Sequence, residues 1–232
     1  MARFTLAYSS FISRLEEVNL LARSALTKER KNPFVLQQEI NALCRGALVL
    51  LCSHLEAYVR DIGEVALDSL HQKHVPRNIL VPRLFYHISK DIFDDIHDIT
   101  DHDKLASRVF DFIRSDLPYW SPSGPFPDPI AADRFSRGFA SPAVKKIAQY
   151  FNRFGYTDYK RDMKSQLKGQ YDATIALIDH LVDIRNKIAH GDTSVTKTPQ
   201  ELLEMIGLVR VYCATTDSVF SSWFGRSFCT IR

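Results

Sequence analysis

Apolar residues recur every three or four positions over four long stretches of the chain, and this spacing predicts four long amphipathic helices. The stretches are residues 5–26, 34–70, 171–190 and 198–223. The last one opens with Thr198, Pro199 and Glu201, which suit an N-cap, a first helical position and a capping box. The polar segment 27–32 is predicted to be the loop that joins the first two helices.

Shorter helices are predicted in the middle of the chain, at residues 79–97, 104–117 and 142–152. A loop is expected at 118–129, because the segment 119–129 contains four prolines and proline lacks the backbone donor that a helix needs. Short connections between the long helices favour an all-α, up-and-down four-helix bundle. We expect a single domain, 1–232, in which residues 76–158 form a helical insertion between the second and third main helices.

Hydrophobic residues make up 45% of the chain, which is enough for a core, yet the longest unbroken apolar run is 47–52. Crossing a bilayer takes roughly 20 such residues, so we expect a core helix there and no membrane association. Charged residues interrupt the N-terminal apolar stretch too early for a signal peptide, so we expect a cytoplasmic protein. The four cysteines form no CxxC pair and are expected to be free thiols rather than disulfides or zinc ligands.

The net charge of +3 is too small to indicate a nucleic-acid binder, but the cations are unevenly placed. Between residues 134 and 170, two Asp stand against nine Lys or Arg, which are Arg134, Arg137, Lys145, Lys146, Arg153, Lys160, Arg161, Lys164 and Lys168. The interleaved aromatic residues are Phe151, Phe154, Tyr156 and Tyr159. This composition suits a surface that holds a phosphate backbone and stacks unpaired bases. The RNA-binding candidates are Lys145, Lys146, Arg153, Lys160, Arg161 and Lys164. The alternative is an ordinary solvated helix face.

Residues 91–103 are dense in side chains that bind metals. They are Asp91, Asp94, Asp95, His97, Asp98, Asp101, His102 and Asp103. A metal-dependent phosphohydrolase of the HD type would use such residues, but its ligands converge from several distant helices. This cluster is local and straddles a helix break, where Asp101 suits an N-cap. We therefore expect a solvated acidic turn and no metal.

The octapeptide RNKIAHGD, residues 185–192, places an arginine and a histidine near the end of the third long helix. Arg185 projects from the middle of the apolar arc, and His190 lies roughly 140° around the helix axis on the polar side. Burying an unpaired guanidinium costs several kcal/mol, so Arg185 must meet a carboxylate or face a polar cleft. Gly191 is expected to end the helix in the left-handed conformation. The structural alternative is a salt bridge from Arg185 to a neighbouring helix, with His190 at the negative end of the helix dipole.

This stretch has an arginine, a polar residue, three more residues, then His and Gly, and it closely resembles the motif of the HEPN superfamily (higher eukaryote and prokaryote nucleotide-binding domains). Residues 47–67 resemble the long apolar helix that carries an H-L-E-x-Y-x-R element in stand-alone HEPN proteins of toxin and defence type. The matching residues are His54, Leu55, Glu56, Tyr58 and Arg60. The resemblance covers roughly residues 1–75 and 140–225 and does not cover the middle.

The resemblance implies a metal-independent endoribonuclease without a cofactor, acting as a toxin or an antiviral-defence effector. Two protomers would pair as a homodimer through the motif helix, so that Arg185 and His190 of both chains line one composite cleft. One His190 would take the proton from a ribose 2′-hydroxyl, its mate would protonate the departing 5′-oxygen, and Arg185 would stabilise the phosphorane. The expected partners are RNA, the second copy, and a cognate antitoxin or regulatory partner.

Three further residues are assigned supporting roles at this site. Asn186 and Asp183 would position the ligand or the imidazole, and Glu56 would orient Arg185. The alternative for Glu56 is a simple pair with Arg60 one helical turn away.

If the site is composite, the motif helices of two protomers must be in contact. A twofold partner should bury an apolar seam on the motif helix. The seam residues are Ile178, Val182 and Ala189. A rigid helix cannot bring Arg185 and His190 together within one chain, so His190 would reach the seam only if the helix frays at Gly191.

Two other functions remain open. A HEPN fold without catalysis would be a nucleotide- or protein-binding module in which the motif only holds a dimer together, and the acidic cluster would serve a metal-dependent phosphohydrolase. In the proline-rich loop, Trp120 and Phe126 either form a lid over a ligand or pack the loop onto the bundle. Tyr58 is expected to lie in the core.

Overall fold

The computed structural model of the chain describes residues 4–194 and 196–231, and all regular structure in them is helical. The long helices are α1 (Leu6–Lys31), α2 (Gln37–Gln72), α10 (Tyr171–Ala189) and α11 (Pro199–Ser227). The short ones are α3 (Pro82–Ile88), α4 (Lys90–Asp98), α5 (His102–Ser115), α6 (Leu117–Trp120), α7 (Ala132–Ser136), α8 (Val144–Asn152) and α9 (Tyr159–Leu167). Two single 3₁₀ turns, η1 (Arg77–Ile79) and η2 (Lys168–Gln170), complete them. The predicted all-α class is confirmed.

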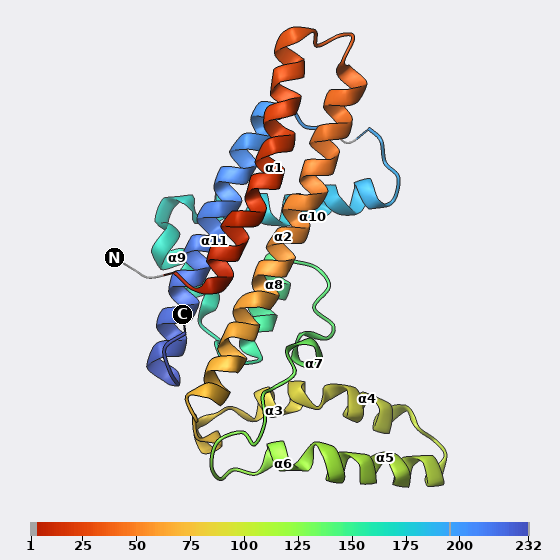
Figure 1. Ribbon diagram of the computed structural model, residues 1–232, viewed down its shortest axis with the longest axis vertical. Coiled ribbons are helices and arrows are strands. Elements are labelled where there is room, and N and C mark those ends of the chain that lie inside the picture. Colours follow the sequence, from red (N-terminus) through yellow and green to blue (C-terminus); the bar gives the residue numbers. More distant parts are fainter. Residues whose placement is uncertain (1–3, 195, 232) are drawn as a thin grey trace.

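Three of the long helices, α1, α2 and α11, run side by side along the long axis of the molecule, whereas α10 lies across them (Figure 1). The predicted up-and-down arrangement therefore describes α1, α2 and α11 but not α10. Helix α9 packs against α11, and α8 packs against α10. Helix α8 is the last helix of the expected insertion, and α9 follows it. Both therefore lie beside the long helices, as the motif helix does, and the apolar pattern of the long helices alone does not predict this.

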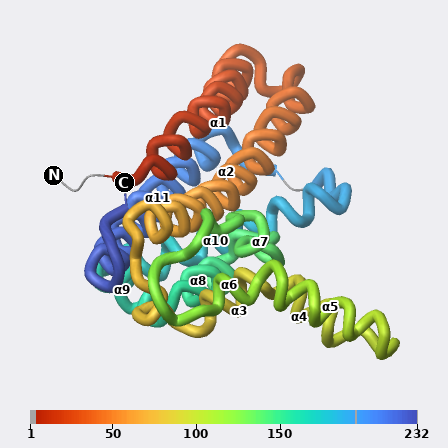
Figure 2. Tube along the Cα trace, turned by 60° about the horizontal axis from the view of Figure 1, so that its bottom comes forward, coloured from red at the N-terminus to blue at the C-terminus, as the bar shows by residue number. Residues whose placement is uncertain are grey.

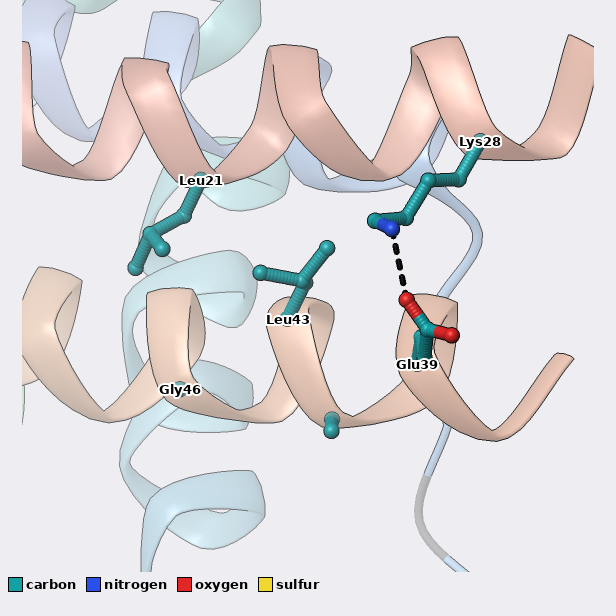
Figure 3. Close-up of a pocket in the computed structure, with 6 residues that line it drawn as sticks. Leu21, Lys28, Glu39, Leu43 and Gly46 are labelled. Carbon is teal, nitrogen blue, oxygen red and sulfur yellow. Dashed lines mark hydrogen bonds and ion pairs between the residues drawn. The ribbon is translucent and has the colours of Figure 1, made fainter. Parts of the chain in front are cut away.

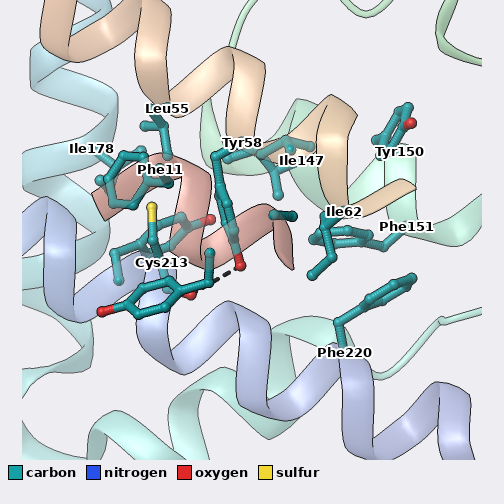
Figure 4. Packing of buried hydrophobic residues seen from close by; sticks show 14 of the residues in the cluster. Phe11, Leu55, Tyr58, Ile62, Ile147, Tyr150, Phe151, Ile178, Cys213 and Phe220 are labelled. Atoms are coloured by element: carbon teal, nitrogen blue, oxygen red, sulfur yellow. Dashed lines mark hydrogen bonds between the residues drawn. The ribbon is translucent and has the colours of Figure 1, made fainter. Parts of the chain in front are cut away.

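Aromatic side chains fill the core where α2, α8 and α11 meet (Figure 4). The ring of Phe151 on α8 stacks on the ring of Phe220 on α11 with centroids 4.6 Å apart. Such pairs contribute about 0.5–1.5 kcal/mol beyond their area burial. Tyr58 of α2 is fully buried, as predicted, and its hydroxyl donates a hydrogen bond of 3.0 Å to the Cys213 carbonyl. This bond leaves the buried phenol with no unsatisfied donor.

Two helix starts follow their sequence signals. At the start of α11, the Thr198 side chain and the Glu201 side chain satisfy each other's backbone N–H groups in a complete capping box. At the start of α5, the Asp101 carboxylate accepts a hydrogen bond of 2.9 Å from the backbone of Lys104. Both predicted caps are confirmed.

The hairpin between α1 and α2 is tighter than predicted. The expected loop at 27–32 is wrong, because α1 continues through Lys31 and α2 begins at Gln37. An ion pair of 2.5 Å between Lys28 and Glu39 links the two helices there, and it borders an apolar hollow of about 360 Å³ (Figure 3). Lysine, glutamate and arginine are good helix formers, so polarity alone does not predict a loop.

The middle of the chain contains more and shorter helices than its apolar pattern predicts. The helix expected at 79–97 is two helices, α3 and α4, which meet at Ser89. The expected loop at 118–129 begins inside the short helix α6 and is irregular from residue 121 onward. Helices α7 and α9 lie outside the predicted helices. The buried residues of this region belong to the same core as those of the long helices, and the boundaries of the insertion, 76–158, stay a prediction.

Helices α4 and α5 form an arm that projects from the body of the molecule (Figures 1 and 2). Arg134 of α7 holds the base of this arm through ion pairs with Asp91 at 2.9 Å and with Asp116 at 2.7 Å. Trp120 packs among the aromatic side chains of the arm, and Phe126 is buried in the core. Both aromatic residues therefore pack the proline-rich loop onto the protein and do not form a lid.

By length and composition alone, α2 could cross a membrane, and it is the one helix of the described residues that passes this test. The core helix of a soluble protein passes the same test. Here α2 contacts α1, α10 and α11 and contributes many of the buried core residues. The prediction of a core helix around 47–52 is confirmed.

Candidate active site

The RNKIAHGD segment lies at the C-terminal end of α10 and just beyond it, and this helix end has the hydrogen bonds of a Schellman C-cap. The Gly191 N–H donates to the Ile188 carbonyl and the Asp192 N–H donates to the Lys187 carbonyl, both at 3.0 Å. Gly191 has a φ of +84°, which confirms it as the residue that ends the helix. His190 stands just before it, with φ −86° and ψ 10°. The fraying on which a swinging His190 depends does not occur here, because these hydrogen bonds hold the helix end closed.

Arg185 reaches toward α2 and meets a carboxylate there. Its Nη2 lies 3.7 Å from Oε2 of Glu56, and the two side chains are 26% and 21% exposed. The Oε1 atom of the same carboxylate accepts a hydrogen bond of 2.8 Å from Arg60, which also donates to the Phe139 carbonyl. Glu56 thus pairs with both arginines, and the two roles considered for it coexist. Each pair is partly solvated and contributes about 1 kcal/mol or less to stability.

The thiol of Cys52 lies beside Arg185, one helical turn before Glu56 on α2. Burial raises the pKa of this thiol, Arg185 lowers it in part, and Glu56 raises it further. The thiol therefore stays protonated at neutral pH, and the negative charge near Arg185 belongs to Glu56. Arg45, on the same face of α2, donates to the Thr193 carbonyl at 3.5 Å and ties α2 to the segment after the motif. Cys52 and Arg45 belong to no motif, and their helical spacing from Glu56 is the signal that could have found them.

Three other candidate residues face outward from α10. His190, Asn186 and Asp183 are all exposed. Because the helix is regular through Ala189, the side chains of Arg185 and His190 leave its axis roughly 140° apart. One chain therefore directs the guanidinium toward α2 and the imidazole toward solvent, and does not bring them together.

The predicted apolar seam is wrong for two of its three residues. Ile178 and Val182 are buried inside the same chain, where α10 contacts α2, α8, α9 and α11. Ala189 is exposed. The outward face of α10, which His190 continues, is instead polar with a few small residues. Its exposed residues are Asp172, Ala173, Ala176, Asp179, His180, Asp183, Asn186, Lys187 and His190. Pairing of two chains through this helix stays a prediction, and such an interface would be polar.

The basic segment does not form the base-stacking surface predicted for it. Its four aromatic residues, at 151, 154, 156 and 159, are at most 1% exposed and belong to the core, so they cannot stack on bases. Arg134 and Arg161 pair with aspartates, and Arg153 donates to the carbonyls of Phe135 and Arg137. The exposed lysines are Lys145, Lys146, Lys160, Lys164 and Lys168. The candidate RNA surface is thereby reduced to lysine side chains that can neutralise phosphates.

Several aspartates and histidines of 91–103 pair with nearby side chains, and the cluster does not converge on one point. Asp94 pairs with Lys90, Asp95 with Arg108, and His97 with Asp98. Within the parts of the chain that the structure describes, no three His, Cys, Asp or Glu side chains are grouped so that they could hold a metal ion. The cysteines are free thiols, as expected; they are Cys44, Cys52 and Cys213, which are buried, and the partly exposed Cys229. The geometry lends no support to a phosphohydrolase.

Comparison with known proteins extends the resemblance across the chain. A family model described as RiboL-PSP-HEPN matches residues 9–222, including the middle region that the two motif matches leave out. Searches of curated proteins and of solved structures find no match. Membership of a HEPN family supports a role in RNA cleavage or in nucleotide binding. The chain belongs to the RiboL-PSP-HEPN family of HEPN domains.

Proposed function

We propose that this chain is a metal-independent endoribonuclease that cleaves RNA at a composite site formed by two copies. The observation that carries the proposal is the end of α10, where Glu56 holds Arg185 at a half-buried position and a closed helix end presents His190 to solvent. A guanidinium can stabilise the phosphorane and an imidazole can move protons. These two groups suffice for phosphodiester transfer without a metal.

The proposed reaction is an intramolecular transesterification. The ribose 2′-oxygen attacks the neighbouring phosphorus while a neutral imidazole removes its proton. The bond from phosphorus to the 5′-oxygen breaks while an imidazolium protonates that oxygen. The products are a 2′,3′-cyclic phosphate and a 5′-hydroxyl, and no water is consumed. The base and the acid need two imidazoles in different protonation states, and His190 supplies both, one from each chain.

Arg185 is the proposed transition-state stabiliser. Its contact with Glu56 is 3.7 Å long, beyond hydrogen-bond range, so the guanidinium keeps donors for the phosphate oxygens. Glu56 sets the direction of the side chain. Asn186 and Asp183 lie on the same exposed face as His190, where they would position the RNA or the imidazole.

The geometry of one chain supports the proposal that two chains pair. Since Arg185 and His190 point in different directions from a closed helix, a cleft that uses both needs a second protomer. The C-terminal end of α10 is the proposed contact. Arg185 lies there on the side of α2, so the imidazole of one protomer would have to approach the partner's guanidinium from that side. We also propose a toxin or antiviral-defence role with a cognate antitoxin or regulatory partner, for which growth arrest on expression is the test.

A nucleotide-binding module is the second candidate function. The separation of Arg185 and His190 within one chain favours it, because Arg185 alone can hold a phosphate without any proton transfer. Under this alternative the purified protein binds nucleotides or RNA and leaves them intact.

The deciding experiment identifies the ends of RNA treated with the purified protein. Mass spectrometry should find 2′,3′-cyclic phosphate and 5′-hydroxyl ends, formed equally well in excess EDTA. DNA and RNA methylated at every 2′-oxygen should remain intact, because neither has the attacking hydroxyl. RNA that is bound but never cleaved supports the binding module, and 5′-phosphate ends that need a divalent cation contradict the proposal.

Mixed dimers test whether the site is composite. Wild-type protein is exchanged with rising amounts of His190→Ala protein at constant total concentration. If each site needs both imidazoles, the rate should fall as the square of the wild-type fraction. A linear fall would show that each chain works alone. Light scattering that finds only a 26.6 kDa species at micromolar concentration would also contradict the dimer.

A further inference from the structure

A polar pocket of about 260 Å³ lies between α9 and α11. Figures 1 and 2 show α9 on the side of the molecule opposite the C-terminal end of α10. No residue of the motif lines this pocket. Its chemistry therefore has to be explained separately from the candidate active site.

The α11 side of the pocket is a ridge of Ser218, Ser222 and Arg226, which follow one another at one-turn spacing on the same face. Short serine side chains leave a hollow over Val219, which is buried. Arg226 is exposed, and among the described residues no carboxylate forms an ion pair with it. The α11 ridge thus offers a guanidinium and two hydroxyl groups.

The α9 side contributes one acidic residue, and its carboxylate is already engaged. One oxygen of Asp162 accepts a hydrogen bond of 2.8 Å from the Tyr156 hydroxyl, and the other accepts one of 3.2 Å from Nε of Arg161. The remaining polar lining on this side is the Ser165 hydroxyl and the Gln166 amide. Arg161 is in turn paired with Asp158 and Asp162. The groups left to a ligand are therefore the Arg226 guanidinium, which only donates, and serine hydroxyls and an amide, which can donate.

Positive charge exceeds negative charge around the pocket. From Asp158 to Lys168, the chain carries four cations and two carboxylates. The cations are Lys160, Arg161, Lys164 and Lys168. Arg226 adds a fifth from α11. A small anion is therefore attracted to this face, and the donors of the pocket can hold it in place.

We propose that this pocket binds a terminal phosphate group, such as that of a nucleoside 5′-monophosphate or of a 5′-phosphorylated RNA end. A terminal phosphate carries about two negative charges and three strong acceptor oxygens, which match the Arg226 guanidinium and the hydroxyls of the lining. The pocket is smaller than the roughly 300–1,000 Å³ of a pocket that encloses a drug-sized ligand. It holds the phosphate and leaves the base outside, so the identity of the base should matter little.

The test is isothermal titration calorimetry on the full chain with adenosine 5′-monophosphate, inorganic phosphate and adenosine. The two phosphates should bind and adenosine should not. Arg226→Gln should weaken phosphate binding about tenfold or more, since hydrogen bonds to charged groups are the strong ones. Ser222→Ala should weaken it a few-fold, and it serves as the second variant if Arg226→Gln does not fold. Arg23→Gln, an exposed arginine of α1, is the matched control and should bind as the wild type does.

The source of the phosphate is resolved with short RNA oligomers methylated at every 2′-oxygen, so that no cleavage intervenes. An oligomer with a 5′-phosphate that binds more tightly than its 5′-hydroxyl twin, and more tightly than the mononucleotide, identifies an RNA end as the ligand. Equal binding of the two oligomers alongside clear mononucleotide binding identifies a free nucleotide.

Two results would overturn the inference. One is the absence of phosphate binding by the wild type. The other is binding that Arg226→Gln and Ser222→Ala leave unchanged, in particular if Arg185→Ala abolishes it, because the phosphate then belongs to the motif. RNA cleavage by the wild type is measured separately, on an RNA with a 5′-hydroxyl end that offers this pocket no terminal phosphate, so failure of this inference is distinct from failure of the proposed nuclease.

Discussion

One face of α2 is loosely packed at one position and tightly packed two turns later. At Glu56 it faces α10 through polar side chains that are partly solvated and separated by 3.7 Å. Seven residues later, at Gly63, it faces α8 with no room for a side chain. A Cβ on Gly63 would lie 2.1 Å from the hydroxyl oxygen of Tyr150, and that hydroxyl is fixed by a hydrogen bond of 2.9 Å with Ser136. The polar candidates for chemistry thus lie where packing is loose, beside a rigid support.

The two regions should respond differently to mutation. In the loose region, the partners of a truncated side chain are solvated, so truncation should lower the free energy of unfolding only slightly. Its main effect should be on activity. In the tight region any added atom must displace neighbours, so the cost falls on stability. This division separates a functional role of Arg185 from a merely structural one.

The largest effect is expected from Arg185→Ala and His190→Ala. Each should lower RNA cleavage by about a hundredfold or more, because a proton-transfer group or a charge stabiliser is removed. Each should change the free energy of unfolding by about 1 kcal/mol or less, because Arg185 is partly solvated, His190 is exposed, and Glu56 keeps its pair with Arg60. Initial rates on a fluorogenic RNA and urea denaturation measure the two quantities.

Lys187→Ala is the matched control for these variants, since Lys187 is an exposed cation of the same helix, and it should cleave at close to the wild-type rate. If Arg185→Ala unfolds the protein, the structural salt bridge is the better account of that residue. Full activity in His190→Ala would rule out the proposed mechanism.

The next effect is on stability in the tight region. Gly63→Ala should destabilise the protein by about 1–3 kcal/mol, even though alanine is the better helix former by up to about 1 kcal/mol. Gly46→Ala on the same helix should stabilise it by about 0.5–1 kcal/mol, because nothing lies within 4 Å of a Cβ built at Gly46. Chemical denaturation of both variants measures the difference. Equal effects at the two glycines would remove the distinction between the loose and tight regions.

The sequence predicts the end of α10, the start of α11 and the partner of Arg185 correctly, because these depend on local rules. At the end of α10, the Gly191 N–H donates to Ile188 and the Asp192 N–H donates to Lys187. Thr198 caps α11 through a residue three positions later. Glu56 is found from its place beside the apolar arc of α2. In each case the decisive contact is either within one turn or on one recognisable helix face.

The errors concern contacts between segments far apart in the sequence. The apolar periodicity of α10 does not show whether Ile178 and Val182 face the same chain or a partner chain. In the structure they face the same chain, because α2, α8, α9 and α11 all contact α10. Phe151 and Tyr159 lie among lysines in the sequence, yet both are buried. The sequence gives the neighbours of each residue along the chain. It does not show which face of a short helix packs against the core.

A smaller effect is expected from Glu56→Gln, which keeps the shape of the side chain and removes its charge. Arg185 then loses its anchor and samples more directions, so cleavage should fall about three- to tenfold, mainly in kcat. Stability should change by about 1 kcal/mol or less. Glu39→Gln is the control, because Glu39 pairs with Lys28 at the far end of α2 from Gly63 and should leave cleavage unchanged. Loss of cleavage to the level of Arg185→Ala would instead place Glu56 directly in the reaction.

The smallest effect concerns His54, which lies on α2 close to Glu56 and faces α1. Burial lowers the pKa of its imidazole, Glu17 raises it in part from 3.6 Å, and the net pKa lies below the ordinary value of 6.5. The folded state therefore favours the neutral ring. The stability that this ring contributes is complete above its unfolded-state pKa and is lost as the pH falls through the lower folded-state pKa.

His54→Gln should accordingly reduce the fall in the free energy of unfolding between about pH 7.5 and about pH 5.5. Urea denaturation at the two pH values measures it for both proteins. His180→Gln, an exposed histidine of α10, should keep the wild-type dependence on pH. If His54→Gln also shows the wild-type dependence of stability on pH, burial of His54 does not contribute to that dependence. The contacts between α1 and α2 at His54 would then be as loosely packed as those between α2 and α10, and the tightly packed region of α2 would begin between His54 and Gly63.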